Sequence, residues 1–118
     1  MSLTFPKSAR LKTRADFERV KENGKRISCR YFVLNILASE MITGHLALGI
    51  ITTKKMGAAN KRARARRLIR ETFRINQHNI KTPCHLVVVA KRDILTLKQK
   101  TVENEFIRLC QKLEIWKD

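Results

Sequence analysis

The spacing of hydrophobic and polar residues predicts six elements in the order α-β-β-α-β-α. The first is a short helix over residues 14–23. A capping-box pattern that starts at Thr13 marks its beginning, and Gly24 supplies its stop. Phe17 and Val20 then lie on the inner side of this helix.

Residues 30–38 are rich in β-forming side chains and predict a strand, and residues 45–53 predict a second one. The turn signal Thr43-Gly44 between them favours a hairpin. One face of the first strand is wholly apolar, and the other is mixed, with Tyr31, Val33, Asn35 and Leu37. Regular pairing would put Ala47, Gly49, Ile51 and Thr53 beside that mixed face.

Residues 58–77 predict a long helix without a breaker, and residues 86–90 a short buried strand. Thr96 with Gln99 indicates a capping box that opens a final amphipathic helix. This order predicts an α+β fold with three or four strands and a single domain over residues 1–118.

The charge is concentrated in one segment of the chain. The 118 residues carry 26 Lys and Arg against 10 Asp and Glu, a formal charge of +16. Residues 54–81 hold 10 basic groups and 1 acidic group. Such a patch repels itself, so it predicts a polyanionic partner, with nucleic acid first and an anionic membrane surface second.

Other compositional features exclude several classes of protein. No apolar run is long enough for a transmembrane helix, and the N-terminal residues lack a secretory signal, so we expect a cytoplasmic protein. The three cysteines lack the spacing of a disulfide framework or a zinc site. The three histidines share no metal-ligand spacing, so catalysis by the protein itself is not expected.

The predicted central helix has one apolar side and one basic side. Ala65, Leu68, Ile69 and Phe73 cluster toward the sheet, whereas Arg64, Arg67, Arg70 and Arg74 lie on the opposite side. Arg62 and Arg66 fall near the apolar side, so they either extend past the sheet edge or reach into a cleft beside it. Glu71 is the only acidic residue between Lys54 and Lys81, so ion pairs within the helix cannot account for these arginines. The pattern predicts contact with RNA or DNA phosphates.

The segment KKMGAANKRARARRLIRETFR, residues 54–74, resembles the signature helix of the protein subunit of bacterial ribonuclease P. Residues 10–12, 16–20 and 30–34 resemble the N-terminal pattern of that family, and residues 86–91 resemble its last strand. Three blocks in the right order carry more weight than a basic helix alone.

The resemblance implies a two-layer α/β sandwich of the ribosomal protein S5 domain 2 type, with a left-handed βαβ crossover. It implies a protein that binds a catalytic RNA and the 5′ leader of precursor tRNA, and promotes endonucleolytic removal of that leader. The chemistry would belong to Mg²⁺ ions acting through the RNA, with no catalytic residue, bound metal or cofactor in the protein. No membrane and no obligatory protein partner are expected.

The resemblance also assigns two sets of binding residues. Those for the RNA subunit are Lys54, Lys55, Lys61, Arg62, Arg64, Arg66, Arg67, Arg70 and Arg74. Those for the leader, in a cleft between the signature helix and the mixed sheet face, are Arg10, Lys12, Phe17, Lys21, Tyr31, Asn35, Thr53 and Lys91.

Three positions depart from the family pattern. Ala63 replaces the Asn of the R-N-R motif, Lys21 stands where many members have a second aromatic residue, and Asn35 stands where some have Tyr. We therefore expect leader binding to depend more on charge than on stacking. The alternative interpretations are a ribosomal or general RNA-binding protein and a protein-only ribonuclease.

Overall fold

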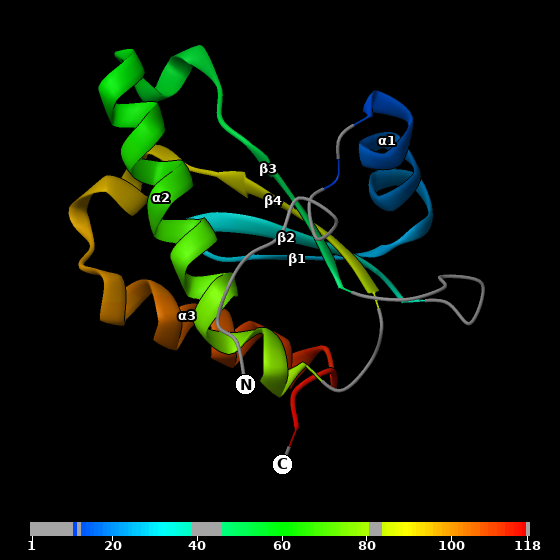
Figure 1. The fold of residues 1–118 in the computed structure, drawn as a ribbon. Helices are drawn as coiled ribbons and strands as arrows, with labels where there is room; N and C mark the ends of the chain where they lie inside the picture. The colour runs from blue at the N-terminus through cyan, green and yellow to red at the C-terminus, as the bar shows by residue number, and fades with distance from the viewer. Residues whose placement is uncertain (1–10, 12, 39–45, 81–83, 118) are drawn as a thin grey trace.

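The computed structural model describes residues 11, 13–38, 46–80 and 84–117, which form one four-stranded sheet and three α-helices (Figure 1). The strands are β1 (Lys25–Ser28), β2 (Phe32–Ala38), β3 (Ala47–Ile51) and β4 (Cys84–Ala90). The helices are α1 (Arg14–Asn23), α2 (Ala59–Asn76) and α3 (Gln99–Lys112). Short 3₁₀ turns are η2 (Lys54–Met56), η3 (Gln77–Asn79) and η4 (Arg92–Thr96).

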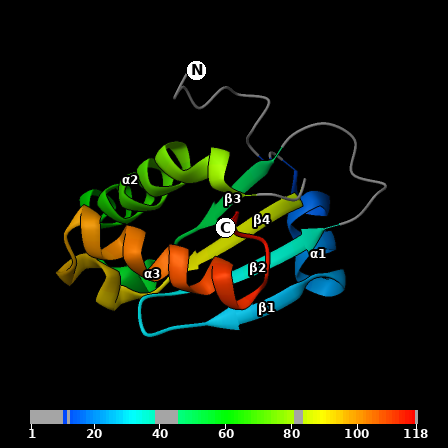
Figure 2. The same ribbon diagram turned by 90° about the horizontal axis from the view of Figure 1, so that it is seen from below.

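Helices cover the two faces of the sheet unequally. α2 and α3 lie on one face, and α1 lies on the other (Figures 1 and 2). The strand register places Leu34, Leu48, Leu86 and Val88 on the face below α2 and α3, where they join the main hydrophobic core. The α+β sandwich predicted from the sequence is confirmed, with four strands.

The predicted hairpin between residues 30–38 and 45–53 is wrong. The sheet order is β1-β2-β4-β3, so β4 separates β2 from β3. β4 suits this central place because Leu86, Val87 and Val88 are consecutive apolar residues, and all three are buried in a strand covered on both faces. β2 instead pairs antiparallel with β1, a strand the hydrophobic pattern missed because Ile27 is its one apolar residue. The Thr43-Gly44 turn lies outside the described residues.

β3, α2 and β4 form a crossover between adjacent parallel strands, with Leu48 opposite Leu86 and Ile50 opposite Val88. Figures 1 and 2 together show that this β3–α2–β4 connection is left-handed, which is rare in proteins. It places the start of α2 at the carboxyl end of β3.

The limits of the first helix follow the prediction. The Oγ1 atom of Thr13 accepts a hydrogen bond from the Asp16 N–H at 3.1 Å, and the helix ends at Asn23. Gly24 is needed for space, because a Cβ atom there would lie 2.4 Å from the carbonyl oxygen of Ile36.

The predicted capping box of the last helix is wrong. The Thr96 hydroxyl donates to the Asp93 carbonyl at 2.8 Å and so closes η4 instead, and α3 begins only at Gln99. The Gln99 side chain turns toward α2, where its Nε2 atom donates to Thr72 Oγ1 at 2.6 Å and to the Leu68 carbonyl at 3.1 Å. A side chain with partners on a neighbouring helix was not predictable from local spacing.

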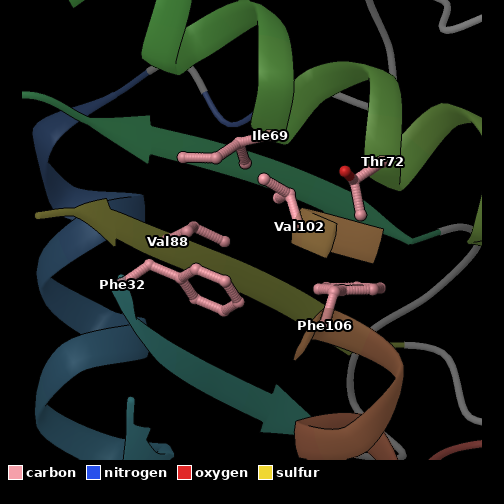
Figure 3. Close-up of a pocket in the computed structure, with 6 residues that line it drawn as sticks. All are labelled: Phe32, Ile69, Thr72, Val88, Val102 and Phe106. Carbon is pink, nitrogen blue, oxygen red and sulfur yellow. The ribbon is translucent and has the colours of Figure 1, made fainter. Parts of the chain in front are cut away.

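The core between α2, α3 and the sheet is closely packed. Figure 3 shows six residues from these elements around a cavity of only about 10 Å³. Thr72 brings a hydroxyl to this apolar lining, and that hydroxyl donates to the Leu68 carbonyl at 2.8 Å. The α2 surface predicted to face the sheet, Ala65, Leu68, Ile69 and Phe73, is buried as expected. Within the described part of the chain, no helix is long and apolar enough to cross a membrane.

Two of the three cysteines are inaccessible. Cys84 and Cys110 are fully buried, and burial raises the pKa of each thiol from its ordinary 9.0 to about 12. Cys29 is partly exposed. All three thiols are free in the structure.

We predict that Cys84 and Cys110 make the protein lose stability between about pH 9 and pH 12. In that range the unfolded thiols ionise while the folded thiols stay protonated, so each pH step favours unfolding. Urea unfolding under reducing conditions at pH 7.5 and 10.5 measures the loss. It should be smaller in the Cys84→Ala/Cys110→Ala variant than in the wild type, and unchanged in Cys29→Ala. Equal losses in all three proteins would contradict the assignment.

Candidate nucleic-acid interface

The nine cations predicted to bind an RNA subunit all belong to η2 and α2, and we call this surface the basic helix face. It consists of Lys54, Lys55, Lys61, Arg62, Arg64, Arg66, Arg67, Arg70 and Arg74. Lys54, Lys55, Lys61, Arg64 and Arg67 are exposed, and the other four are partly exposed. Burial of the apolar side of α2 turns these cations outward.

Several of these side chains are held by the protein. Arg74 forms an ion pair with Glu71, and its hydrogen bonds keep the pKa of the Glu71 carboxyl below the ordinary value. Arg64 donates from Nη2 to the Leu97 carbonyl at 3.2 Å. Contacts of this kind reduce the conformational freedom that a phosphate contact would otherwise have to remove.

Arg66 connects the basic helix face to the sheet. Its Nη1 atom donates to Thr52 Oγ1 at 2.8 Å, just beyond the carboxyl end of β3. The side chain is therefore directed at the end of the sheet. Its guanidinium retains further donors beyond the one that Thr52 uses.

The start of α2 adds backbone donors to this charge. Ala58 occupies the N-cap and makes no side-chain cap hydrogen bond, and the first turn carries no acidic residue. Gly57, which precedes it, has a φ of +114°, a conformation that side-chain-bearing residues rarely adopt. The Lys61 N–H of the first turn donates to Asn60 Oδ1 at 3.0 Å. The positive end of the helix dipole lies close in sequence to Lys54, Lys55 and Lys61, which favours anionic groups.

The face of the sheet opposite α2 and α3 is covered only in part. On this face Asn35, Val87 and Gly49 form one row across β2, β4 and β3, and Val33, Val89 and Ile51 form the next. Val87 and Gly49 are buried near α1, whereas Val89 and Ile51 are partly exposed. We call the uncovered part, Ser28, Ile51, Thr53, Val89 and Lys91, the open sheet face.

Lys91 and Thr53 lie at the margins of the open sheet face. The Lys91 ammonium donates to Ser28 Oγ at 2.8 Å and to the Cys29 carbonyl at 2.6 Å, so it is anchored beside the β1–β2 turn. Thr53 is exposed and directly precedes η2. The open sheet face therefore runs up to the first cations of the basic helix face.

The other predicted leader residues have different positions. Phe17 is partly buried on α1, and Lys21 is exposed on the same helix. Tyr31 is partly buried and packs against the main core. Asn35 is 3% exposed, and its Nδ2 atom donates to the Val87 carbonyl at 3.4 Å. Arg10 and Lys12 lie outside the described residues.

An interaction between α1 and β4 was missed by the sequence analysis. Arg19 Nη2 lies 3.1 Å from His85 Nδ1 and 3.3 Å from Asp16 Oδ1. Burial and the neighbouring Arg19 charge lower the pKa of His85, so the neutral ring can accept a hydrogen bond from Arg19. The Asp16–Arg19 spacing was a local signal of the ion pair, but the partner on β4 was not visible from sequence.

No metal centre competes with this interpretation. Among residues 11, 13–38, 46–80 and 84–117, no group of three His, Cys, Asp or Glu side chains is placed to hold a metal ion. A basic helix beside a partly open sheet face, on an α+β scaffold, is typical of a nucleic-acid-binding protein.

Comparison with known proteins identifies the family. The family model described as Ribonuclease P matches residues 5–114. The ribonuclease P protein component of Desulforapulum autotrophicum is 33% identical over 95% of this chain and 94% of its own, and that of Syntrophus aciditrophicus is 37% identical over 93% and 91%. The structure of Staphylococcus aureus RNase P protein covers 94% of this chain and 100% of its own with a TM-score of 0.82, at 27% identity. The chain belongs to the ribonuclease P protein family, the protein components of a ribonucleoprotein endoribonuclease that matures tRNA 5′ ends.

Proposed function

We propose that the basic helix face binds the catalytic RNA subunit and that the open sheet face binds the 5′ leader of precursor tRNA. The hydrolysis would be carried out by Mg²⁺ ions held by the RNA. The protein would act in the cytoplasm, where it would contribute binding energy and position the leader.

The observation that carries this proposal is the junction of the two surfaces at Arg66. Its contact with Thr52 brings a guanidinium from α2 to the end of β3, beside Thr53 and the open sheet face. A single-stranded leader leaving the sheet at this point would meet cations of the same helix that binds the RNA subunit. One rigid element would thereby fix the leader relative to the catalytic RNA.

The composition of the open sheet face supports binding that tolerates sequence variation. Ile51 and Val89 offer apolar surface to bases, and Lys91 offers charge. Asn35 is buried, so its amide stabilises the sheet and does not face the leader. Phe17 is then the aromatic residue that lies at the margin of the open sheet face. Stacking and phosphate contacts read no particular sequence, which suits leaders of variable sequence.

We expect the purified chain to stimulate leader removal by the catalytic RNA at low Mg²⁺ and to bind precursor tRNA more tightly than mature tRNA when in the holoenzyme. Cleavage rates and affinities of the holoenzyme with both tRNAs test this. Absence of stimulation would contradict the proposed function and favour a general RNA-binding protein. Cleavage by the protein without the RNA would instead show a protein-only ribonuclease.

Replacing Arg64 and Arg67 by Ala should weaken binding of the catalytic RNA by more than tenfold, because both are exposed on the basic helix face and each can contact a phosphate. The matched control is Lys100→Ala/Lys112→Ala, which removes the same charge from the exposed surface of α3. Equal losses in the two double variants would contradict a localised interface.

With roughly 6–10 phosphates contacted, the affinity of the wild-type protein for the catalytic RNA should fall by about 10³–10⁵ between 50 and 200 mM salt.

A further inference from the structure

We propose that Gly49 is a positioning residue for RNA binding. Its missing side chain leaves the space in which the Phe17 ring rests, and this fixes where the ring meets the leader. The inference rests on the proposed function of the open sheet face, and it concerns a residue that has no RNA contact of its own in that proposal.

The Phe17 ring occupies the space of a Gly49 side chain. A Cβ atom built on Gly49 would lie 2.5 Å from Cε1 of Phe17, 2.6 Å from Cζ and 3.3 Å from Cδ1. Real Cβ atoms essentially never approach other heavy atoms within 3.0 Å. The ring therefore lies directly on the backbone of β3 and could not do so above any other residue type.

The backbone of Gly49 gives no other reason for glycine. Among the described residues, Gly57 is the glycine with a positive φ, so Gly49 has a conformation open to alanine. A glycine inside a strand weakens it and is typical of a close approach by another group. Here that group is the Phe17 ring, and the requirement is for space alone.

The helix that carries Phe17 is held on both sides of the ring. Val20 is fully buried, and the chain at Gly24 lies so close to β2 that a Cβ atom there would be 2.4 Å from the Ile36 carbonyl oxygen. Arg19 contacts His85 on β4, and before the helix the Leu11 N–H donates to the Leu48 carbonyl on β3 at 3.0 Å. Because α1 cannot easily move away, a methyl group at Gly49 would displace the ring instead.

The position of the ring connects this packing to RNA. Gly49 precedes Ile51 by two residues on the same face, so the ring lies where the covered part of the sheet meets the open sheet face. A partly exposed aromatic ring at this boundary can stack on an unpaired base of single-stranded RNA. Its displacement would change the stacking geometry while leaving the charge of both surfaces unchanged.

A double-mutant cycle of Phe17→Ala, Gly49→Ala and the combined variant tests the proposal. The readout is the affinity of the holoenzyme for precursor relative to mature tRNA. We expect Phe17→Ala to lower this preference by roughly 5- to 140-fold, the range for loss of one stacked base. Gly49→Ala should lower the preference for precursor tRNA severalfold when Phe17 is present, and by less than twofold in the Phe17→Ala background.

Two outcomes separate the failure of this inference from that of the proposed function. No effect of Phe17→Ala on the preference would contradict the leader contact of Phe17 itself. A normal effect of Phe17→Ala together with equal effects of Gly49→Ala in both backgrounds, or no effect in either, would overturn the role of Gly49. Catalytic RNA affinity should stay constant throughout the cycle.

If Gly49→Ala is unstable, NMR and folding measurements still test the contact between Gly49 and the Phe17 ring. The wild-type protein should show a nuclear Overhauser effect between the Phe17 ring protons and the Gly49 Hα protons, and its absence would overturn the contact. If Gly49→Ala alone fails to fold, the combined variant should fold, because the smaller side chain at position 17 makes room for the methyl group. Failure of both would show that Gly49 is needed for another reason.

Discussion

Burial of one side of α2 between the sheet and α3 is the constraint on which both candidate surfaces depend. Ala65, Leu68, Ile69 and Phe73 are each at most 6% exposed. Hydrogen bonds from Gln99 to Thr72 and Leu68, and from Asn76 to Glu103, fix the rotation of α2 against α3. With that rotation fixed, the arginines of α2 lie on the side of the helix away from the core, where all of them are exposed or partly exposed. The crossover then brings the start of the helix to the end of β3, where the open sheet face begins.

The same arrangement gathers nine cations and a single carboxylate on η2 and α2. Glu71 is the one acidic side chain on η2 or α2, and it is already paired with Arg74. Repulsion among the remaining cations opposes folding, and a bound polyanion would relieve it. Binding of RNA should therefore stabilise the folded chain as well as provide its function. The protein is best understood as the protein component of a ribonucleoprotein.

Local signals in the sequence predicted much of this structure, and non-local ones did not. The period of Leu68, Ile69 and Phe73 identified the buried side of α2, and Thr13 marked the start of α1. The partner of β3 was mispredicted because a turn signal says nothing about a later strand that is apolar on both faces. Arg66 was predicted to lie near the sheet, but its contact with Thr52 could not be predicted, because it depends on how α2 packs at the end of β3. Likewise, Gly49 was predicted only to lie beside the mixed face of the first strand, because the ring that rests on it comes from a helix distant in sequence.

The central claim is that two adjacent surfaces bind two different RNAs, and site-directed crosslinking tests it most directly. In a Cys29→Ser background, where the remaining thiols at Cys84 and Cys110 are buried, a photoreactive group is attached to Ala63→Cys, Thr53→Cys or Lys112→Cys in turn. In the holoenzyme with precursor tRNA, position 63 should crosslink to the catalytic RNA, position 53 to the leader, and position 112 to neither at comparable yield. Crosslinking of position 112 to the catalytic RNA as efficiently as position 63, or no leader crosslink from position 53, would contradict the account.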